Sequence, residues 1–425
     1  MNTIIRSAEV LLKENGVYTV KKCDIGIEND TIRHVGDIPK DFAYDKIING
    51  EGKFATPSLI NCHTHAYMSV FRNLADDLPF DKWLFESIMP REDRMTNDGA
   101  KAGAMLSLIE MIKSGTGCFV DMHMFPKASA EVAKELGMRA VITRGLAGEM
   151  QTDGGAERRF REALDEMEEY KDDKNLTFMI APHAIYTCGE KTLRHSAELA
   201  KELGVGINLH LSETEYEFNS CKQEHGMTPV EYCDSLGLLT DRTLAAHLVK
   251  LTDGDIDILA ERGVSMASCP ISNMKLGNGF APIEKLQRAG VNITLGTDSC
   301  ASNNTVNLFP DMRAYALIHK GKLGDALSVS AADTVDAVTV NAARALGLNA
   351  GAIEEGKLAD ITLYNLSEPT LCPKNNLLSA MAYSMSGYEA DTLIIGGKVI
   401  MQNKEVLTAD VEKIYYDAQK VIDIL

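Results

Sequence analysis

The stretch Phe54-Ala-Thr-Pro-Ser-Leu-Ile-Asn-Cys-His-Thr-His65 is an apolar run that ends in two histidines. His63 and His65 are two positions apart, so both side chains of an extended segment point to the same face. Two neutral imidazoles placed in this way can bind one transition metal, such as zinc or iron. A strand end with two solvated histidines is the alternative. The rest of the chain decides between them, because it can supply the missing ligands.

The composition is that of an ordinary globular protein, with 45% hydrophobic and 24% charged residues. A chain of 425 residues can bury a large core, and we expect more than one folding unit. The net charge of −18 argues against nucleic acid and anionic membranes as partners, because their phosphates would be repelled. We therefore expect a small neutral or zwitterionic substrate, and we leave open whether the chain forms a homo-oligomer.

Cysteine usage and the apolar runs indicate a cytoplasmic protein. The nine cysteines include no Cys-x-x-Cys pair and are typical of reduced, buried residues. Residues 1–10 lack the apolar core of a signal peptide. No apolar run approaches the ~20 residues that a membrane helix needs.

Eight apolar runs alternate with amphipathic segments through the middle of the chain. This alternation predicts a (β/α)₈ TIM barrel over residues 53–350. A doubly wound open sheet is the alternative, but the sequence lacks its phosphate-binding glycine fingerprint. The runs are 54–62, 117–122, 138–144, 176–181, 206–211, 243–247, 263–268 and 291–297.

Both ends of the chain have strand composition. Residues 1–52 and 351–407 contain short β-type runs, and Gly396-Gly397 indicates a hairpin turn. We predict that the two segments pair into one small β-sandwich domain. Residues 408–425 have the pattern of an amphipathic C-terminal helix.

Polar residues follow the predicted strands at their carboxyl ends, where TIM barrels place their active sites. They are His63, His65, His123, Arg144, His183, His210, His247 and Asp298. Four of them would surround one divalent cation and leave a position for water: His63, His65, His210 and Asp298. We expect Zn²⁺, with Fe²⁺ or Mn²⁺ as alternatives.

Glu213 lies three residues after His210, close enough to act as a general acid or base beside such a metal. The alternative is a structural role, in which Ser212 caps a helix and Glu213 is a carboxylate of its first turn. The two interpretations are compatible, and we favour the functional one.

Several motifs resemble those of the amidohydrolase superfamily, in its mononuclear deaminase and chlorohydrolase branch. They are His63-Thr-His65, His210-x-x-Glu213, Ala246-His247 and Gly296-Thr-Asp298. Segments 76–84, 89–92, 270–276 and 298–304 resemble more closely the S-adenosylhomocysteine/5′-methylthioadenosine deaminases. Residues 351–360 are similar to the returning β domain of that branch, so the resemblance covers nearly the whole chain.

The resemblance implies a ligand set and a set of substrate contacts. The ligands would be His63, His65, His210 and Asp298. The fourth strand has no lysine that could bridge two metals, so we expect one metal per chain. The substrate contacts would be Glu92 on the ribose hydroxyls, His183 on the purine edge, Arg144 and Glu213. Ser299-Cys300 departs from the small residues usual beside the metal aspartate, which bears on substrate fit.

Other candidates have a structural interpretation of comparable weight. Trp83 would either cover the nucleobase or pack in the core. Arg158 and Arg159, near the start of a predicted helix, would meet a substrate carboxylate or be solvated. His123 would be a core residue or a neighbour of the ligands, and Arg144 could pair with a carboxylate of the protein.

The reaction that we expect is hydrolytic deamination of an adenine nucleoside. Water deprotonated with help from Asp298 and His247 would attack C6, while Glu213 would protonate N1. The expected substrates are S-adenosylhomocysteine, 5′-methylthioadenosine, 5′-deoxyadenosine or adenosine. A deaminase or chlorohydrolase of guanine, a pteridine or a triazine is the alternative among enzymes. A metal-binding interaction protein without catalysis is the alternative outside them.

Overall fold

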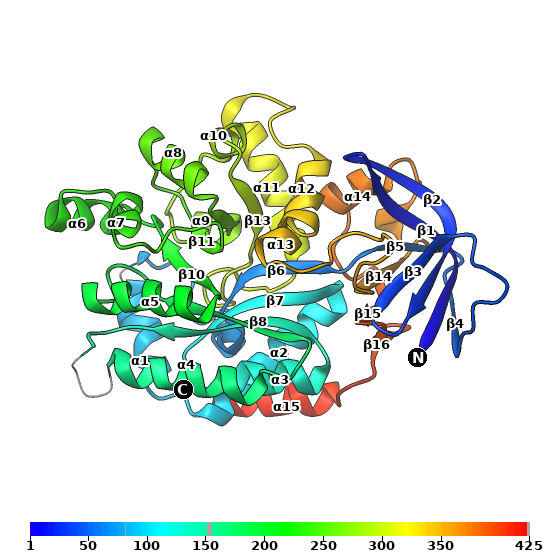
Figure 1. Ribbon diagram of the computed structural model, residues 1–425, viewed down its shortest axis with the longest axis horizontal. Coiled ribbons are helices and arrows are strands. Elements are labelled where there is room, and N and C mark those ends of the chain that lie inside the picture. Colours follow the sequence, from blue (N-terminus) through cyan, green and yellow to red (C-terminus); the bar gives the residue numbers. More distant parts are fainter. Residues whose placement is uncertain (81, 151–154, 423–425) are drawn as a thin grey trace.

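The computed structural model describes residues 1–80, 82–150 and 155–422. Its strands form two sheets, one of eight strands and one of nine. Figure 1 shows the nine-stranded sheet at one side of the molecule, next to the larger body of helices around the eight-stranded sheet. No helix among the described residues is long and apolar enough to cross a membrane.

The eight-stranded sheet is a TIM barrel, as the alternation of apolar and amphipathic segments predicts. Neighbouring strands pair in parallel and in chain order, and nearly every residue in them is buried. Strands buried on both faces explain the continuous apolar runs in the sequence. The strands are β6 (Leu59–Thr64), β7 (Thr116–His123), β8 (Arg139–Leu146), β9 (Leu176–Pro182), β10 (Gly206–Leu211), β11 (Thr243–His247), β12 (Ser265–Ser268) and β13 (Asn292–Leu295).

The barrel closes where β13 returns to β6. The backbone N–H of Asp298 donates to the carbonyl of His63 at 2.9 Å. The Asn61 amide exchanges two hydrogen bonds with Thr297. Gly296 permits this approach, because a Cβ there would lie 2.6 Å from the Cβ of His63. Closure therefore brings Asp298 directly beside the first two histidines.

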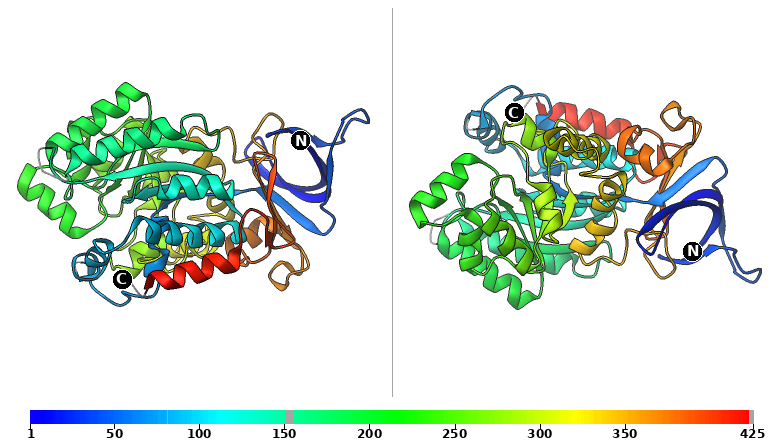
Figure 2. Two further views of the ribbon diagram at one scale, coloured as in Figure 1. Left: turned by 90° about the horizontal axis from the view of Figure 1, so that it is seen from below. Right: turned by 90° about the horizontal axis from the view of Figure 1, so that it is seen from above.

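Helices cover the outside of the barrel (Figure 2). Threonine or serine N-caps begin several of them, and a glycine in the left-handed region ends several, often at the two ends of the same helix. The larger ones are α2 (Asn97–Ser114), α3 (Ala128–Leu136), α4 (Ala156–Tyr170), α5 (Glu190–Leu203), α6 (Glu215–His225), α8 (Asp253–Arg262) and α11 (Leu308–Leu323). Shorter helices are α7 (Pro229–Ser235), α9 (Pro270–Lys275), α10 (Ile283–Arg288), α12 (Ala331–Ala337) and α13 (Val340–Ala345).

The segment between β6 and α2 is a long excursion over the carboxyl end of the barrel. It contains the 3₁₀ helix η1 (Ala66–Phe71), the π-helix η2 (Lys82–Ile88) and the short α1 (Met89–Glu92). Its buried apolar residues, among them Tyr67, Phe71 and Trp83, form a cluster of their own. This cluster forms one wall of the cavity described below.

The nine-stranded sheet combines strands from both ends of the chain. Its strands are β1 (Asn2–Glu14), β2 (Val17–Glu28), β3 (Thr31–Gly36), β4 (Lys46–Asn49), β5 (Lys53–Pro57), β14 (Ile361–Asn365), β15 (Ala390–Ile395), β16 (Lys398–Gln402) and β17 (Glu405–Val406). Strand β5 joins the two halves, because it pairs in parallel with β1 and antiparallel with β14. The prediction of a β domain built from both ends of the chain is thus confirmed, in the form of one mixed sheet.

The boundary of the barrel differs from the predicted one. Residues 53–57 form β5 of the mixed sheet, and the barrel strand β6 begins only at Leu59. One apolar run, 54–62, therefore contributes to two sheets. Helix α15 (Val411–Ile422) follows the mixed sheet and packs on α2, and residues 423–425 of the predicted helix lie outside the described residues.

A buried ion pair connects the amino end of the barrel to the mixed sheet. Arg139 opens β8, and its guanidinium donates to both carboxylate oxygens of Asp360, just before β14. The carboxylate also accepts the N–H of Gly396 at 2.6 Å. The pair is therefore fully hydrogen-bonded, as a buried charge requires.

Candidate metal centre and substrate cavity

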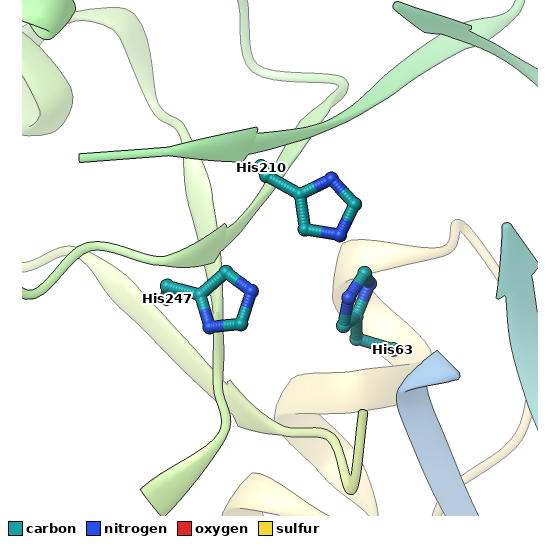
Figure 3. Close-up of side chains that lie close together, drawn as sticks. All are labelled: His63, His210 and His247. Carbon is teal, nitrogen blue, oxygen red and sulfur yellow. The ribbon is translucent and has the colours of Figure 1, made fainter. Parts of the chain in front are cut away.

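Four predicted ligands from three parts of the barrel converge at its carboxyl end. His63 and His65 lie at the end of β6, His210 on β10 and Asp298 just beyond β13. The Nε2 atoms of His65 and His210 are 3.2 Å apart. Asp298 Oδ1 is 3.5 Å from His65 Nε2 and 3.7 Å from His63 Nε2. Figure 3 shows the imidazoles of His63, His210 and His247 converging on one space.

The hydrogen bonds of two histidines fix their tautomers. His65 Nδ1 lies 2.7 Å from the carbonyl of Met122, and His210 Nδ1 lies 2.8 Å from the carbonyl of His183. A carbonyl only accepts, so each Nδ1 carries the hydrogen and each Nε2 presents a lone pair. Two lone pairs that face each other at 3.2 Å repel unless a cation lies between them. This arrangement fits a metal ion.

His63, the remaining predicted histidine ligand, supports the same interpretation. Both ring nitrogens of His63 are buried without a hydrogen-bond partner. Burial and the neighbouring imidazoles hold the pKa of His63 and of His210 well below the usual value, so both rings are neutral. Neutral imidazoles are the form that binds metals. The cluster is a histidine-rich metal site.

Three donors orient the Asp298 carboxylate. Oδ2 accepts the hydroxyls of Ser272 at 2.6 Å and Ser302 at 3.0 Å, and Oδ1 accepts the Ser299 N–H at 2.7 Å. Burial alone would raise the pKa of Asp298, but the neighbouring histidines and the hydrogen bond from Ser272 outweigh it and lower the pKa to about 2. The carboxylate is therefore ionised and faces the histidine nitrogens through Oδ1.

Glu213 and His247 form a second pair beside the cluster. His247 Nε2 lies 3.8 Å from Glu213 Oε2, and its Nδ1 lies 2.9 Å from Asn273 Oδ1. Burial raises the pKa of Glu213 against the attraction of His247 and the hydrogen bond from Asn278. Burial would lower the pKa of His247, but Glu213 and Asp298 together raise it. The site thus contains one strongly acidic carboxyl and one that holds its proton more tightly.

These groups line one cavity, together with most of the histidine cluster. Trp83, Glu92 and His183 line it, as do His65, His210, Glu213, His247 and Asp298. Its other walls are largely apolar and come from Met68, Phe80, Leu84, Met124, Tyr186 and Leu276, with Tyr67 and Ser299 completing the lining. An apolar pocket with convergent polar groups is what a small aromatic ligand requires.

The three predicted arginine contacts do not line this cavity. Arg144 is buried and its guanidinium donates to Glu162 at 2.7 Å and 3.0 Å, so it has the carboxylate partner that the sequence left as the alternative. Arg158 pairs with the same Glu162 from the exposed side of α4. Arg159 donates to the carbonyl of Gly145 and to Met124 Sδ. Because Met124 lines the cavity, Arg159 lies directly behind the cavity wall.

His123 also lies behind the wall. Its Nε2 is 3.1 Å from Glu166 on α4, and both side chains are almost fully buried. Its Nδ1 lies 2.9 Å from the carbonyl of Phe125. His123 thus has the protein-internal role that the sequence left open, and it fixes the loop that carries Met124.

Three residues near the site gave no signal in the sequence. Glu217 accepts the N–H of Ser212 at 3.0 Å and of Glu213 at 2.7 Å, so it shapes the turn that carries Glu213. The Tyr67 hydroxyl donates to Glu92. Asn278 donates to Glu213 at 2.9 Å. Only Glu217 has a pattern that could have pointed to it: it lies four residues after Glu213, a spacing at which side chains in a first helical turn contact each other.

The fold and the site together define a class: a TIM barrel with a histidine-rich metal site at the carboxyl ends of its strands. The model of the amidohydrolase family matches residues 54–400. The chain belongs to the amidohydrolase family.

Relatives of known name cover almost the whole chain. A 5-methylthioadenosine/S-adenosylhomocysteine deaminase from Caldanaerobacter subterraneus is 43% identical over 99% of this chain and 98% of its own length. A 5′-deoxyadenosine deaminase from Methanothermobacter thermautotrophicus is 41% identical over 91% of each chain. The crystal structure of an adenosine deaminase from Xanthomonas campestris with bound zinc superposes with a TM-score of 0.94, at 32% identity over 99% and 98% of the two chains.

Proposed function

We propose that this protein deaminates an adenine nucleoside by hydrolysis and releases ammonia. The observation that carries the proposal is the pairing of the histidine cluster with two carboxyls of opposite character, Asp298 and Glu213. The relatives named above support the substrate class, because each is named for an adenine nucleoside. The product is the corresponding inosine analogue.

One divalent metal, for which we expect Zn²⁺, would be held by His63, His65, His210 and Asp298. It would supply Lewis-acid activation of water, whose pKa such ions lower towards ~7. Fe²⁺ and Mn²⁺ can bind to the same kinds of donor, so elemental analysis of the purified protein is needed to identify the metal. His247 lies close enough to His63 and His210 to be a further candidate ligand. We assign it to proton transfer instead, because its Nε2 also lies 3.8 Å from Glu213 Oε2.

The carboxyls and His247 move the protons. Asp298 and His247 lie beside the attacking water and accept its proton. Glu213, whose pKa is raised by burial, donates a proton to N1 of the purine as the oxygen bonds to C6. The C6–N6 bond then breaks as the amine takes the proton that Asp298 and His247 accepted from the water, and it leaves as ammonia. The hydroxyl at C6 returns its proton to Glu213 and becomes the carbonyl of the product.

The cavity wall recognises the rest of the nucleoside. Glu92, held by the Tyr67 hydroxyl, accepts hydrogen bonds from the ribose hydroxyls. His183 meets the purine edge as a neutral imidazole, because burial and nearby cations lower its pKa to about 3. Trp83 covers the purine, and its indole N–H is already bonded to the carbonyl of Ala301 at 3.2 Å.

The arginines of α4 and β8 form a cationic region for the 5′ end of the substrate. Arg144 and Arg158 share Glu162, whereas Arg159 forms no ion pair within the described part of the chain. Burial and then the two neighbouring arginines lower the pKa of Arg159. The amino-acid carboxylate of S-adenosylhomocysteine has the chemistry to complete this group.

The test is turnover of adenosine, 5′-deoxyadenosine, 5′-methylthioadenosine and S-adenosylhomocysteine, followed by loss of adenine absorbance and by ammonia release. We expect deamination of at least one of them by the metal-replete protein. Guanine, a pterin and a chlorotriazine are assayed alongside, because the same chemistry at carbon would act on them. Turnover of one of these rings alone would overturn the substrate class. If the metal-replete protein turned over none of these compounds, the result would favour a metal-binding interaction protein without catalysis.

A further inference from the structure

Asp311 has a fully buried carboxyl group behind the site, and no cation of the described residues pairs with it. It lies in the first turn of α11 with 0% of its surface exposed. Burial raises its pKa to about 8, opposed by hydrogen bonds from Asn303 and Ile271 and by no positive charge. Burying a carboxyl group costs free energy even when the group stays protonated, unless its hydrogen bonds offset the lost hydration. Its presence needs a reason other than packing.

The carboxylate connects two segments that are far apart in the sequence. Oδ1 accepts the backbone N–H of Ile271 at 3.2 Å, at the start of α9. Oδ2 accepts the side-chain amide of Asn303 at 2.8 Å, in the loop that follows Asp298. Asp311 therefore sets the position of α9 relative to that loop.

The first segment carries two groups that touch the site. Ser272, next to Ile271, donates its hydroxyl to Asp298 Oδ2 at 2.6 Å. Asn273, one residue further, holds His247 Nδ1 at 2.9 Å. The orientation of both Asp298 and His247 thus depends on where this turn lies.

The second segment holds Asp298 from behind. Asn303 Nδ2 also donates to the carbonyl of Thr297, the residue before Asp298, at 2.8 Å. Ser302, next to Asn303, donates to Asp298 Oδ2 at 3.0 Å. Asp298 has a φ of +63°, a region that non-glycine residues seldom adopt, so its backbone needs such restraints.

We propose that Asp311 is a positioning residue for this site, which fixes Asp298 and His247 through α9 and the 298–304 loop. It touches neither the substrate nor the reacting atoms. The proposal rests on the proposed function for the roles of Asp298 and His247, but the hold on Asp298 itself does not depend on it. Groups around a metal site that orient its ligands typically affect activity or metal affinity by 10–100-fold.

The experiment compares Asp311→Ala with Asp255→Ala. Asp255 is also a buried first-turn carboxylate, on α8, and it also joins two segments, since it accepts the N–H of Thr252 and the hydroxyl of Thr228. It contacts none of the site residues described above. We expect both variants to melt at lower temperature, but only Asp311→Ala to lose kcat, by roughly 10–100-fold with KM unchanged. Asp311→Asn should recover part of the loss, because one amide oxygen can still accept one of the two donors.

A double-mutant cycle distinguishes positioning from general destabilisation. If Asp311 acts through the turn at Ile271, the losses in kcat from Asp311→Ala and Ser272→Ala are non-additive in the double variant. Asn303→Ala breaks the other connection and serves if Asp311→Ala does not fold. Additive losses, or a kcat for Asp311→Ala equal to that of Asp255→Ala, would overturn the proposal.

Metal retention gives a readout that does not depend on turnover. Each variant is loaded with zinc and challenged with a chelator, and the metal that remains is measured. We expect Asp311→Ala to release zinc faster than Asp255→Ala, because the Asp298 ligand is less firmly held. If the wild type binds zinc but deaminates nothing, the proposed function fails while this comparison still tests Asp311.

Discussion

The two ends of the barrel differ in whether their buried polar groups have hydrogen-bond partners. At the carboxyl end, the Nε2 atoms of His65 and His210 face each other at 3.2 Å, and both ring nitrogens of His63 lack partners. At the amino end, Arg139 and Asp360 satisfy each other, and Gly396 supplies a further donor. The first arrangement costs stability until a ligand arrives, whereas the second contributes to the junction with the mixed sheet. Function and stability are thereby separated along the barrel axis.

Replacing His210 by alanine is the strongest way to break the carboxyl end. A site with three remaining ligands binds metal too weakly to activate water. We expect loss of both bound metal and measurable turnover, by elemental analysis and ammonia release. Metal-replete, active protein would show that His210 is not a ligand.

Glu213→Gln separates chemistry from metal binding at the same end. Glutamine keeps the shape and accepts the Asn278 hydrogen bond, but it cannot donate and accept a proton in turn. We expect full metal content and a kcat reduced by ~10²–10⁴-fold. Near-normal turnover in the metal-replete variant would contradict the role of Glu213 as the acid.

Arg139→Ala tests the amino end. It leaves Asp360 buried without its counter-charge, which typically costs about 3–5 kcal/mol. We expect a corresponding fall in the free energy of unfolding, measured with denaturant, at unchanged kcat. Replacing both residues of the pair by apolar ones should restore much of the loss. A reduced kcat at normal metal content would mean that the two ends are coupled.

Glu217, at the carboxyl end of the barrel, should make the free energy of unfolding depend on pH. Burial raises its pKa from 4.5 to about 7, so between these values the folded state holds a proton that the unfolded state has released. Its contribution to stability is therefore complete below pH 4.5 and is lost as the pH rises to about 7. Glu217→Gln should flatten the fall in unfolding free energy over this range. Glu198→Gln, which changes an exposed carboxyl of α5, should leave it unchanged. Equal slopes in both variants would rule out the shift.

The smallest effect should come from the arginines at the edge of the site. Arg158→Ala with Arg159→Ala should lower kcat/KM for S-adenosylhomocysteine by roughly 10–100-fold, the value of a hydrogen bond to a charged group. 5′-Methylthioadenosine and 5′-deoxyadenosine lack the carboxylate and should be little affected. Arg161→Ala, on an exposed position of the same helix, is the control. An equal loss on all three substrates would make the two arginines structural.

The sequence predicted the histidine cluster because parallel strands end at one edge of a barrel, so a strand-end residue is placed without further information. It could not predict the contacts of Arg144, since Glu162 lies on a helix whose rotation about its axis depends on packing. It also placed β5 in the barrel, because an apolar run looks the same in either sheet. The role of Asp311 could not be predicted either, because it also lies on a helix and its contacts depend on tertiary packing.

Strand β5 has a consequence for the order in which the chain folds. Its partners are β1, which precedes it by about forty residues of sequence, and β14, which begins at Ile361 after the whole barrel. During synthesis the pairing of β5 with β14 therefore waits until the barrel has been made, and pairing over such a separation is slow. Until then the β14-facing edge of β5 is open to other chains. A protein cut before Ile361 should aggregate even though every residue of its metal site is present.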